Sequence, residues 1–183
     1  KMVRNGEFKQ LIRYKLPFTL GHDLSGVITK VGAEVRGFKV GDEIYSRPRD
    51  LRIGAFAESI AIDAADVALK PTSLSFAEAA AVPLVALAAW QALVDVAHVR
   101  PGQKVLVHAG AGGLGSTVIQ VAKYLGAYVA TTAHTKDINK LTELGAQEWA
   151  QGIREKTAIP AGVKIKYEYL RMMPTCGAKI VVN

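Results

Sequence analysis

The sequence has a single cysteine, Cys176, among its 183 residues. One thiol excludes a disulfide within the chain and any site built from several thiolates, such as a zinc finger or an iron–sulfur cluster. The longest apolar stretch, residues 79–92, is shorter than the ~20 residues that a membrane-spanning helix needs, and Pro83 interrupts it. Residues 1–15 alternate charged with isolated apolar side chains, which is not the pattern of a signal peptide. We therefore predict a cytoplasmic protein without a membrane span.

Acidic residues are also comparatively few, because 16 carboxylates stand against 23 lysines and arginines and leave a formal net charge of +7. Half of the residues are apolar and 21% are charged, which is typical of a globular protein. A basic surface attracts the phosphates of nucleic acids. The sequence has neither zinc-finger spacing nor the aromatic run of an RNA-recognition motif. We therefore expect solvated basic loops rather than a nucleic-acid surface. Binding of an anionic cofactor is another explanation for the excess of basic residues.

The first part of the chain, residues 16–69, reads as short strands separated by turns. Three stretches alternate small or apolar residues with polar ones, as half-buried strands do: residues 25–31, 43–45 and 56–62. Gly32, Gly37 and Gly41 mark turns between them. Short strands with frequent glycines predict a small, barrel-like β unit.

The composition changes at Pro71. Ser75 and Glu78 form a capping box, in which each side chain satisfies a free amide at a helix start. The helix is expected to break at Pro83 and to resume from Leu84 to about residue 97, and its apolarity predicts burial on more than one face. Beyond the turn at residues 100–102, strand and helix patterns alternate, which is typical of a parallel α/β sheet.

A glycine-rich loop connects a predicted strand at 104–108 to a predicted helix at 113–125. Gly126 ends that helix, and residues 127–132 form the next strand. The loop fits the pattern G-x-G-x-x-G at Gly110, Gly112 and Gly115. A strand–helix–strand unit of this length is the context that the dinucleotide fingerprint requires. We therefore predict dinucleotide binding; the alternative is a glycine-rich turn that binds nothing.

Each glycine of the loop has a predicted role. Gly110 permits the tight turn out of the strand, Gly112 lets a diphosphate approach the backbone, and Gly115 lets the helix pack against the sheet. The free amides and the dipole of the helix start then stabilise the diphosphate. The candidate residues at this end of the cofactor are Gly110, Gly112, Gly113, Leu114 and Gly115.

The end of the second strand predicts which dinucleotide binds. A site for NAD usually has Asp or Glu here to bind the ribose hydroxyls. In this sequence residues 131–136 contain no carboxylate, and the first one after the strand is Asp137. Hydroxyl, imidazole and ammonium groups suit a 2′-phosphate instead, so we predict NADP(H). The candidates are Thr131, Thr132, His134, Thr135 and Lys136. Alternatively, or in addition, Thr135 is the N-cap of a helix that runs to Leu144 and stops at Gly145.

Several motifs together resemble the medium-chain dehydrogenase/reductase superfamily, and within it the zinc-independent quinone oxidoreductases and their enone-reducing relatives. They are Gly21-His-Asp-Leu-Ser-Gly26, Val40-Gly-Asp-Glu-Ile44, Phe56-Ala-Glu58, Ala80-Ala-Val-Pro83, Ala89-Trp-Gln-Ala-Leu93, Val99-Arg-Pro-Gly102 and the stretch from Val107 to Gly115. The resemblance implies an α/β protein with a GroES-like β-rich substrate domain and a Rossmann domain with a doubly wound parallel sheet. It implies hydride transfer from NADPH to a quinone or an α,β-unsaturated carbonyl in the cleft between them. A homodimer or homotetramer is expected.

The resemblance also implies three segments. Residues 1–74 belong to the GroES-like domain without its N-terminal part, 75–160 to a truncated Rossmann domain, and 161–183 to later segments of both domains. In the last segment, residues 162–174 resemble a much later part of the family, and residues 177–182 resemble the closing strand of the substrate domain. Complete members are nearly twice as long, so we expect this sequence to join pieces of a longer protein.

We predict no metal site. His22 and Asp23 resemble half of the zinc pair of alcohol dehydrogenases, but Pro83 stands where a ligating cysteine is expected. A His–Asp pair alone does not make a zinc site. The resemblance also implies that the short loop 46–54 stands where zinc-dependent alcohol dehydrogenases have a lobe with four cysteines. Ala88 replaces a threonine that the family often has near the cofactor. We nominate no catalytic residue; a zinc alcohol dehydrogenase relative and a non-catalytic protein that binds RNA or a partner remain the alternatives.

Overall fold

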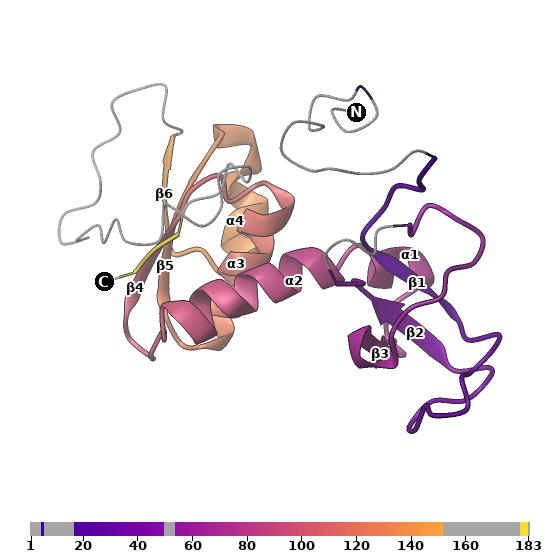
Figure 1. The fold of residues 1–183 in the computed structure, drawn as a ribbon. Helices are drawn as coiled ribbons and strands as arrows, with labels where there is room; N and C mark the ends of the chain where they lie inside the picture. Colours follow the sequence, from indigo (N-terminus) through magenta and orange to yellow (C-terminus); the bar gives the residue numbers. More distant parts are fainter. Residues whose placement is uncertain (1–4, 6–16, 50–53, 152–179, 183) are drawn as a thin grey trace. The chain divides into compact units, whose positions relative to one another are not determined.

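The computed structural model describes residue 5 and residues 17–49, 54–151 and 180–182 of the chain (Figure 1). The chain divides into two compact units, residues 1–84 and residues 85–183. The first unit contains an antiparallel sheet and the second contains a mainly parallel one.

The sheet of the first unit has the order β1-β2-β3. Its strands are β1 (Leu24–Val27), β2 (Glu43–Ser46) and β3 (Val67–Leu69), and the 3₁₀ turn η1 (Ala64–Asp66) precedes β3. Gly26 pairs with Ile44, and Tyr45 pairs with Ala68. The predicted strands at 25–31 and 43–45 are therefore present, the first of them shorter than predicted.

The prediction of a strand at residues 56–62 is wrong. The N–H of Phe56 donates to the carbonyl of Leu20 over 2.8 Å, but residues 57–62 have no strand conformation and Phe56 is 76% exposed. A period of two shows which side chains could share a face, whereas a strand also needs a neighbour to receive its backbone hydrogen bonds.

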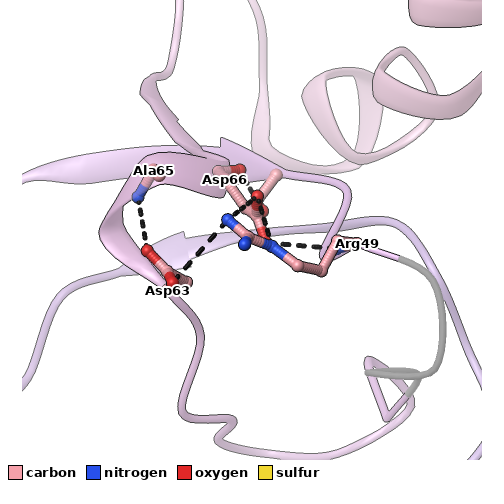
Figure 2. A network of polar contacts seen from close by, with 5 residues as sticks. Arg49, Asp63, Ala65 and Asp66 are labelled. Carbon is pink, nitrogen blue, oxygen red and sulfur yellow. Dashed lines mark hydrogen bonds and ion pairs between the residues drawn. The ribbon is translucent and has the colours of Figure 1, made fainter.

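The loop after β2 is fastened to η1 by a charged network (Figure 2). The guanidinium of Arg49 donates to both carboxylate oxygens of Asp66, at 2.8 Å from Nη2 and 2.9 Å from Nε, and Asp63 lies 3.7 Å from Nη2. The hydrogen bonds from Arg49 hold the pKa of Asp66 below its usual value. Asp63 also accepts the N–H of Ala65 and caps the turn. An ion pair therefore links Arg49, in the described part of this loop, to η1.

The predicted capping box is confirmed at the start of α1 (Phe76–Ala80). The Ser75 hydroxyl accepts the N–H of Glu78, and the Glu78 carboxylate accepts the N–H of Ser75 over 2.8 Å. These reciprocal bonds satisfy two of the amides that a helix start leaves without partners.

A second helix, α2 (Pro83–Trp90), begins at the predicted break and continues as the wider π-helical η2 (Gln91–Val96). Its end near residue 97 agrees with the prediction. Ala89 and Leu93 are fully buried, but the expected burial on more than one face is only partly observed. Three apolar side chains remain 41–49% exposed: Leu84, Leu87 and Trp90.

The sheet of the second unit has the order β6-β5-β4-β7, in which β4, β5 and β6 are parallel and β7 is antiparallel to β4. Its elements are β4 (Lys104–Val107), α3 (Gly113–Tyr124), β5 (Tyr128–Ala133), η3 (Thr135–Asp137), α4 (Ile138–Leu144), β6 (Glu148–Gln151) and β7 (Ile180–Val182). Figure 1 shows α3 and α4 beside each other on the same face of the sheet. The expected α/β fold class, with a GroES-like part and a parallel sheet with helices, is confirmed.

The core of the second unit lies between α3 and the sheet. Val118, Ile119 and Ala122 of α3 are fully buried, as are Val107 and Val129 of the strands beneath them. Burying each valine or isoleucine side chain of this set stabilises the fold by roughly 1.5–3 kcal/mol. This packing fixes the start of α3 relative to the end of β4.

The tail of the chain joins this same sheet. Residues 180–182 pair with β4, in register from Val105 opposite Val182 to Val107 opposite Ile180. The resemblance assigns 177–182 to the other, GroES-like part of the fold. Residues 162–174 and Cys176 lie outside the described residues. Among the residues described, no helix combines the length and apolarity that crossing a bilayer requires.

Candidate functional site

The candidate site begins where β4 turns into α3. The N–H of Gly112 donates to the carbonyl of Ala109 over 3.0 Å and closes the turn, and Ser116 donates to Gly112 to open the helix. Ala109 has a φ of 55°, in the left-handed region. A side chain there costs on the order of 1–2 kcal/mol. The loop thus has its strained residue at Ala109, one position before the glycine that sequence reasoning assigned to the turn.

Two glycines of the motif are required by packing. A Cβ at Gly110 would overlap the hydroxyl of Thr131 and lie 2.9 Å from Ile119, so Gly110 lets the turn rest on β5 and α3. A Cβ at Gly115 would overlap the carbonyl of Ala109 and lie 2.8 Å from the Cα of Gly110. The close packing predicted for Gly115 is therefore observed. Gly110 has no positive φ, so its backbone conformation does not require glycine, and the lack of space for a side chain does.

The other two glycines of the loop, Gly112 and Gly113, are less tightly enclosed. A Cβ at Gly112 would meet only the Ala109 carbonyl, at 3.3 Å, and one at Gly113 would meet only Val85, at 3.9 Å. Both residues are exposed. The outer side of the loop therefore leaves room for a group that approaches the backbone.

The first turn of α3 offers hydrogen-bond donors. Within the part of the chain that the structure describes, the N–H groups of Gly113, Leu114 and Gly115 have no acceptor, and no side chain caps the helix. The nearby hydroxyls of Ser116 and Thr117 donate to the Gly113 carbonyl and leave these amides open. The first turn contains no acidic residue. Free amides, a positive helix end and the space at Gly112 fit the diphosphate of a dinucleotide.

Two threonines at the end of β5 lie beneath the loop. Thr131 is 1% exposed, and its hydroxyl donates to the Val107 carbonyl over 2.8 Å. Thr132 is 7% exposed, and its hydroxyl oxygen accepts the N–H of Ala109 over 3.0 Å. Both hydroxyls are thus engaged with the backbone of β4 and the loop, a use that their sequence positions did not reveal.

The remaining predicted residues follow β5 on the surface. His134, Thr135 and Lys136 are all exposed. Thr135 is the first residue of η3 and not an N-cap; His134 occupies the cap position and makes no side-chain capping bond. The predicted stop at Gly145 is confirmed, because this residue ends α4 with a φ of 117°. An imidazole, a hydroxyl and an ammonium group therefore lie next to one another in the chain after β5.

The His22–Asp23 pair has a structural use. The carboxylate of Asp23 accepts the N–H of Leu84 over 2.8 Å and caps the start of α2. His22 is exposed. Among the described residues, no three His, Cys, Asp or Glu side chains gather as a metal site would require. Helix capping explains why a carboxylate follows His22 here.

Comparison with known proteins identifies the family. The alcohol dehydrogenase GroES-like domain matches residues 1–72. The quinone oxidoreductase of Escherichia coli, solved in complex with NADPH, superposes with a TM-score of 0.71 and 30% identity over 82% of this chain and 45% of that one. The chain belongs to the medium-chain dehydrogenase/reductase superfamily.

Two curated members of the superfamily are reductases. The 2-methylene-furan-3-one reductase of Solanum lycopersicum is 42% identical over 78% of this chain and 38% of its own length. The chloroplastic NADPH-dependent alkenal/one oxidoreductase of Arabidopsis thaliana is 38% identical over 78% of this chain and 39% of its own. The chain thus spans about two-fifths of the length of these relatives.

Proposed function

We propose that the protein is an NADPH-dependent oxidoreductase that transfers a hydride to a quinone or an α,β-unsaturated carbonyl without zinc. The observation that carries the proposal is the open first turn of α3, whose amides lack acceptors within the described residues beside the space at Gly112. When bound, the dihydronicotinamide supplies the hydride, and the protein supplies orientation and a site poor in water.

The chain's own residues divide into two sets toward the cofactor. The amides of Gly113, Leu114 and Gly115 would hold the diphosphate, with Gly112 leaving space for it and Gly110 supporting the loop. His134, Thr135 and Lys136 would hold the 2′-phosphate, since all three are exposed and none repels an anion. Thr131 and Thr132 would support the loop from below. The names of the Arabidopsis reductase and of the E. coli structure, both of which include NADPH, support this choice of dinucleotide.

The substrate class rests on the reductases named above. A furanone with an exocyclic methylene, an alkenal and a quinone each accept hydride at an electron-poor carbon, which supports one class of acceptor for this chain. The use of Asp23 as a helix cap and the presence of Pro83 at a ligand position support a reaction without zinc. No catalytic residue is assigned.

The domain assignment of residues 1–74, 75–160 and 161–183 is part of the proposal. The matched GroES-like region, residues 1–72, supports the first boundary. A homodimer or homotetramer and a cytoplasmic location stay predictions.

The cofactor assignment is tested by titrating the purified protein with NADPH and NADH and recording the difference absorbance. We expect tighter binding of NADPH. Lys136→Gln should weaken NADPH binding about tenfold through loss of a charge-assisted contact and leave NADH nearly unchanged. Lys140→Gln is the matched control, because it removes another exposed ammonium group, on α4. A preference for NADH would contradict the assignment.

The reaction is tested with a panel of quinones and enones under NADPH. We expect oxidation of NADPH by at least one member of the panel, and no loss of activity after treatment with a zinc chelator. Loss of activity on chelation would instead favour a zinc alcohol dehydrogenase. Salt-sensitive retention on RNA without any NADPH oxidation would favour the non-catalytic alternative.

A further inference from the structure

The junction of β4 and the glycine loop is held by one residue of the neighbouring strand. The hydroxyl oxygen of Thr132 accepts the N–H of Ala109, and its main-chain carbonyl accepts the N–H of Gly110, both over 3.0 Å. Two successive N–H groups therefore donate to Thr132 at the point where the chain leaves the sheet. Its side chain reaches Ala109 across the parallel pair β4–β5.

These two bonds act on the strained residue of the loop. Ala109 has a positive φ, which an alanine adopts only where its surroundings require it. Its carbonyl accepts the N–H of Gly112 and lies where a Cβ at Gly115 would be. The orientation of Ala109 thus determines how closely the start of α3 approaches the end of β4, and with it the direction of the free amides.

The side chain of Thr132 is poorly placed to bind a ligand, because it is buried and already has hydrogen-bond partners. It is 7% exposed, its hydroxyl oxygen accepts the N–H of Ala109, and Nδ1 of His108 lies within hydrogen-bond distance of the same oxygen, at 3.3 Å. A hydroxyl has one proton to donate. By contrast, the three residues that would hold the 2′-phosphate are exposed.

We infer that Thr132 is a positioning residue of the cofactor site. It fixes Ala109 and Gly110, so that the amides of α3 face the diphosphate, and it does not contact the cofactor itself. This inference rests on the proposed function. It distinguishes Thr132 from residues that recognise the 2′-phosphate, because the diphosphate is common to NADPH and NADH and the 2′-phosphate is not.

Two variants and three ligands test the inference by calorimetry. Thr132→Val keeps the shape of the side chain but removes the acceptor for the Ala109 amide, so it should weaken NADPH and NADH by the same factor, about tenfold. Adenosine 2′-monophosphate, which has no diphosphate, should bind the variant as it binds the wild type. Thr132→Ser keeps the hydroxyl and should restore both dinucleotide affinities to within about twofold of the wild type.

Three results would overturn the inference: loss of NADPH affinity alone, equal affinities in the wild type and Thr132→Val, or weakened binding of adenosine 2′-monophosphate. If the wild type binds neither dinucleotide, the proposed function itself is wrong, and the inference falls with it. These outcomes separate the two failures.

Amide hydrogen exchange of the wild type provides a test that does not depend on a variant folding. In the free protein, the amides of Ala109 and Gly110 should be protected, while those of Gly113 and Leu114 exchange rapidly and become protected when NADPH is added. Equal and rapid exchange at all four amides of the free protein would overturn the inference.

Discussion

The carboxylate of Glu78 should make the stability of the first unit depend on pH. Hydrogen bonds from the N–H and the hydroxyl of Ser75 hold the pKa of Glu78 below its ordinary value of 4.5. A depressed folded-state pKa stabilises the fold above the unfolded-state value, and this stabilisation is lost as the pH falls through the folded-state pKa.

We therefore expect the stability advantage of the wild type over Glu78→Gln to be present at neutral pH and to disappear on acidification below about pH 4.5. Urea unfolding across this range measures it. Glu143→Gln, an exposed change on α4, is the control and should show no such convergence. A difference that is constant with pH would contradict the role of Glu78.

Single residues also show where sequence reasoning ends. The capping box could be predicted from Ser75 and Glu78, because both halves are local. The positive φ of Ala109 could not, since nothing about an alanine indicates a left-handed backbone. Thr131 and Thr132 were predicted as ligand contacts from their place at the end of a strand, whereas their burial depends on a neighbouring strand that the sequence pattern does not position.

At the scale of elements, the same glycine-to-alanine substitution should have different effects at two positions of the glycine loop. Gly115→Ala places a methyl group into the Ala109 carbonyl and should cost about 1–3 kcal/mol of unfolding free energy. Gly112→Ala meets the same oxygen only at 3.3 Å and should cost less than about 1 kcal/mol. It should instead weaken NADPH binding, because the methyl group occupies the space beside the free amides.

Thermal unfolding and calorimetric titration of both variants separate the two effects. The expected pattern is a stability loss for Gly115→Ala and an affinity loss with near wild-type stability for Gly112→Ala. An unchanged NADPH affinity in Gly112→Ala would remove the basis of the proposed cofactor site.

The start of α2 depends on Asp23, a residue 61 positions away in the sequence. Asp23 accepts the N–H of Leu84, so Asp23→Ala should destabilise the protein by about 1 kcal/mol, as the loss of a helix cap does. Asp23→Asn keeps an acceptor oxygen and should recover most of the loss. Urea unfolding measures both; equal destabilisation by the two variants would contradict the capping role.

Elements in the second unit were the easiest to predict. The strand–helix–strand order around the glycine loop follows from local periodicity and from glycines that end each segment, such as Gly126 and Gly145. In the first unit, periodicity predicted a strand at 56–62 that has no partner strand among the described residues. It did not single out β3, a strand of three residues that pairs with β2. Strand pairing is a long-range property, so alternation alone does not determine it.

At the scale of the chain, these 183 residues carry a net charge of +7, and such an excess of positive charge favours anions. NADPH carries one phosphate more than NADH, so its binding should weaken more steeply as salt rises from about 0.05 M to about 0.5 M. Affinities of both nucleotides across this range measure the difference in slope, and Lys136→Gln should reduce it. Parallel slopes would indicate that the 2′-phosphate makes no charged contact.

The two helices of the first eighty to ninety residues obtain their caps in different ways. Ser75 and Glu78 lie three residues apart, so the cap of α1 closes within one short segment of the chain. The cap of α2 comes from Asp23, which is 61 residues away and immediately precedes β1. Closing so long a loop costs conformational entropy before any contact repays it. The cap of α1 is therefore local in the sequence, whereas the N-terminus of α2 is capped only once Asp23 and Leu84 lie side by side.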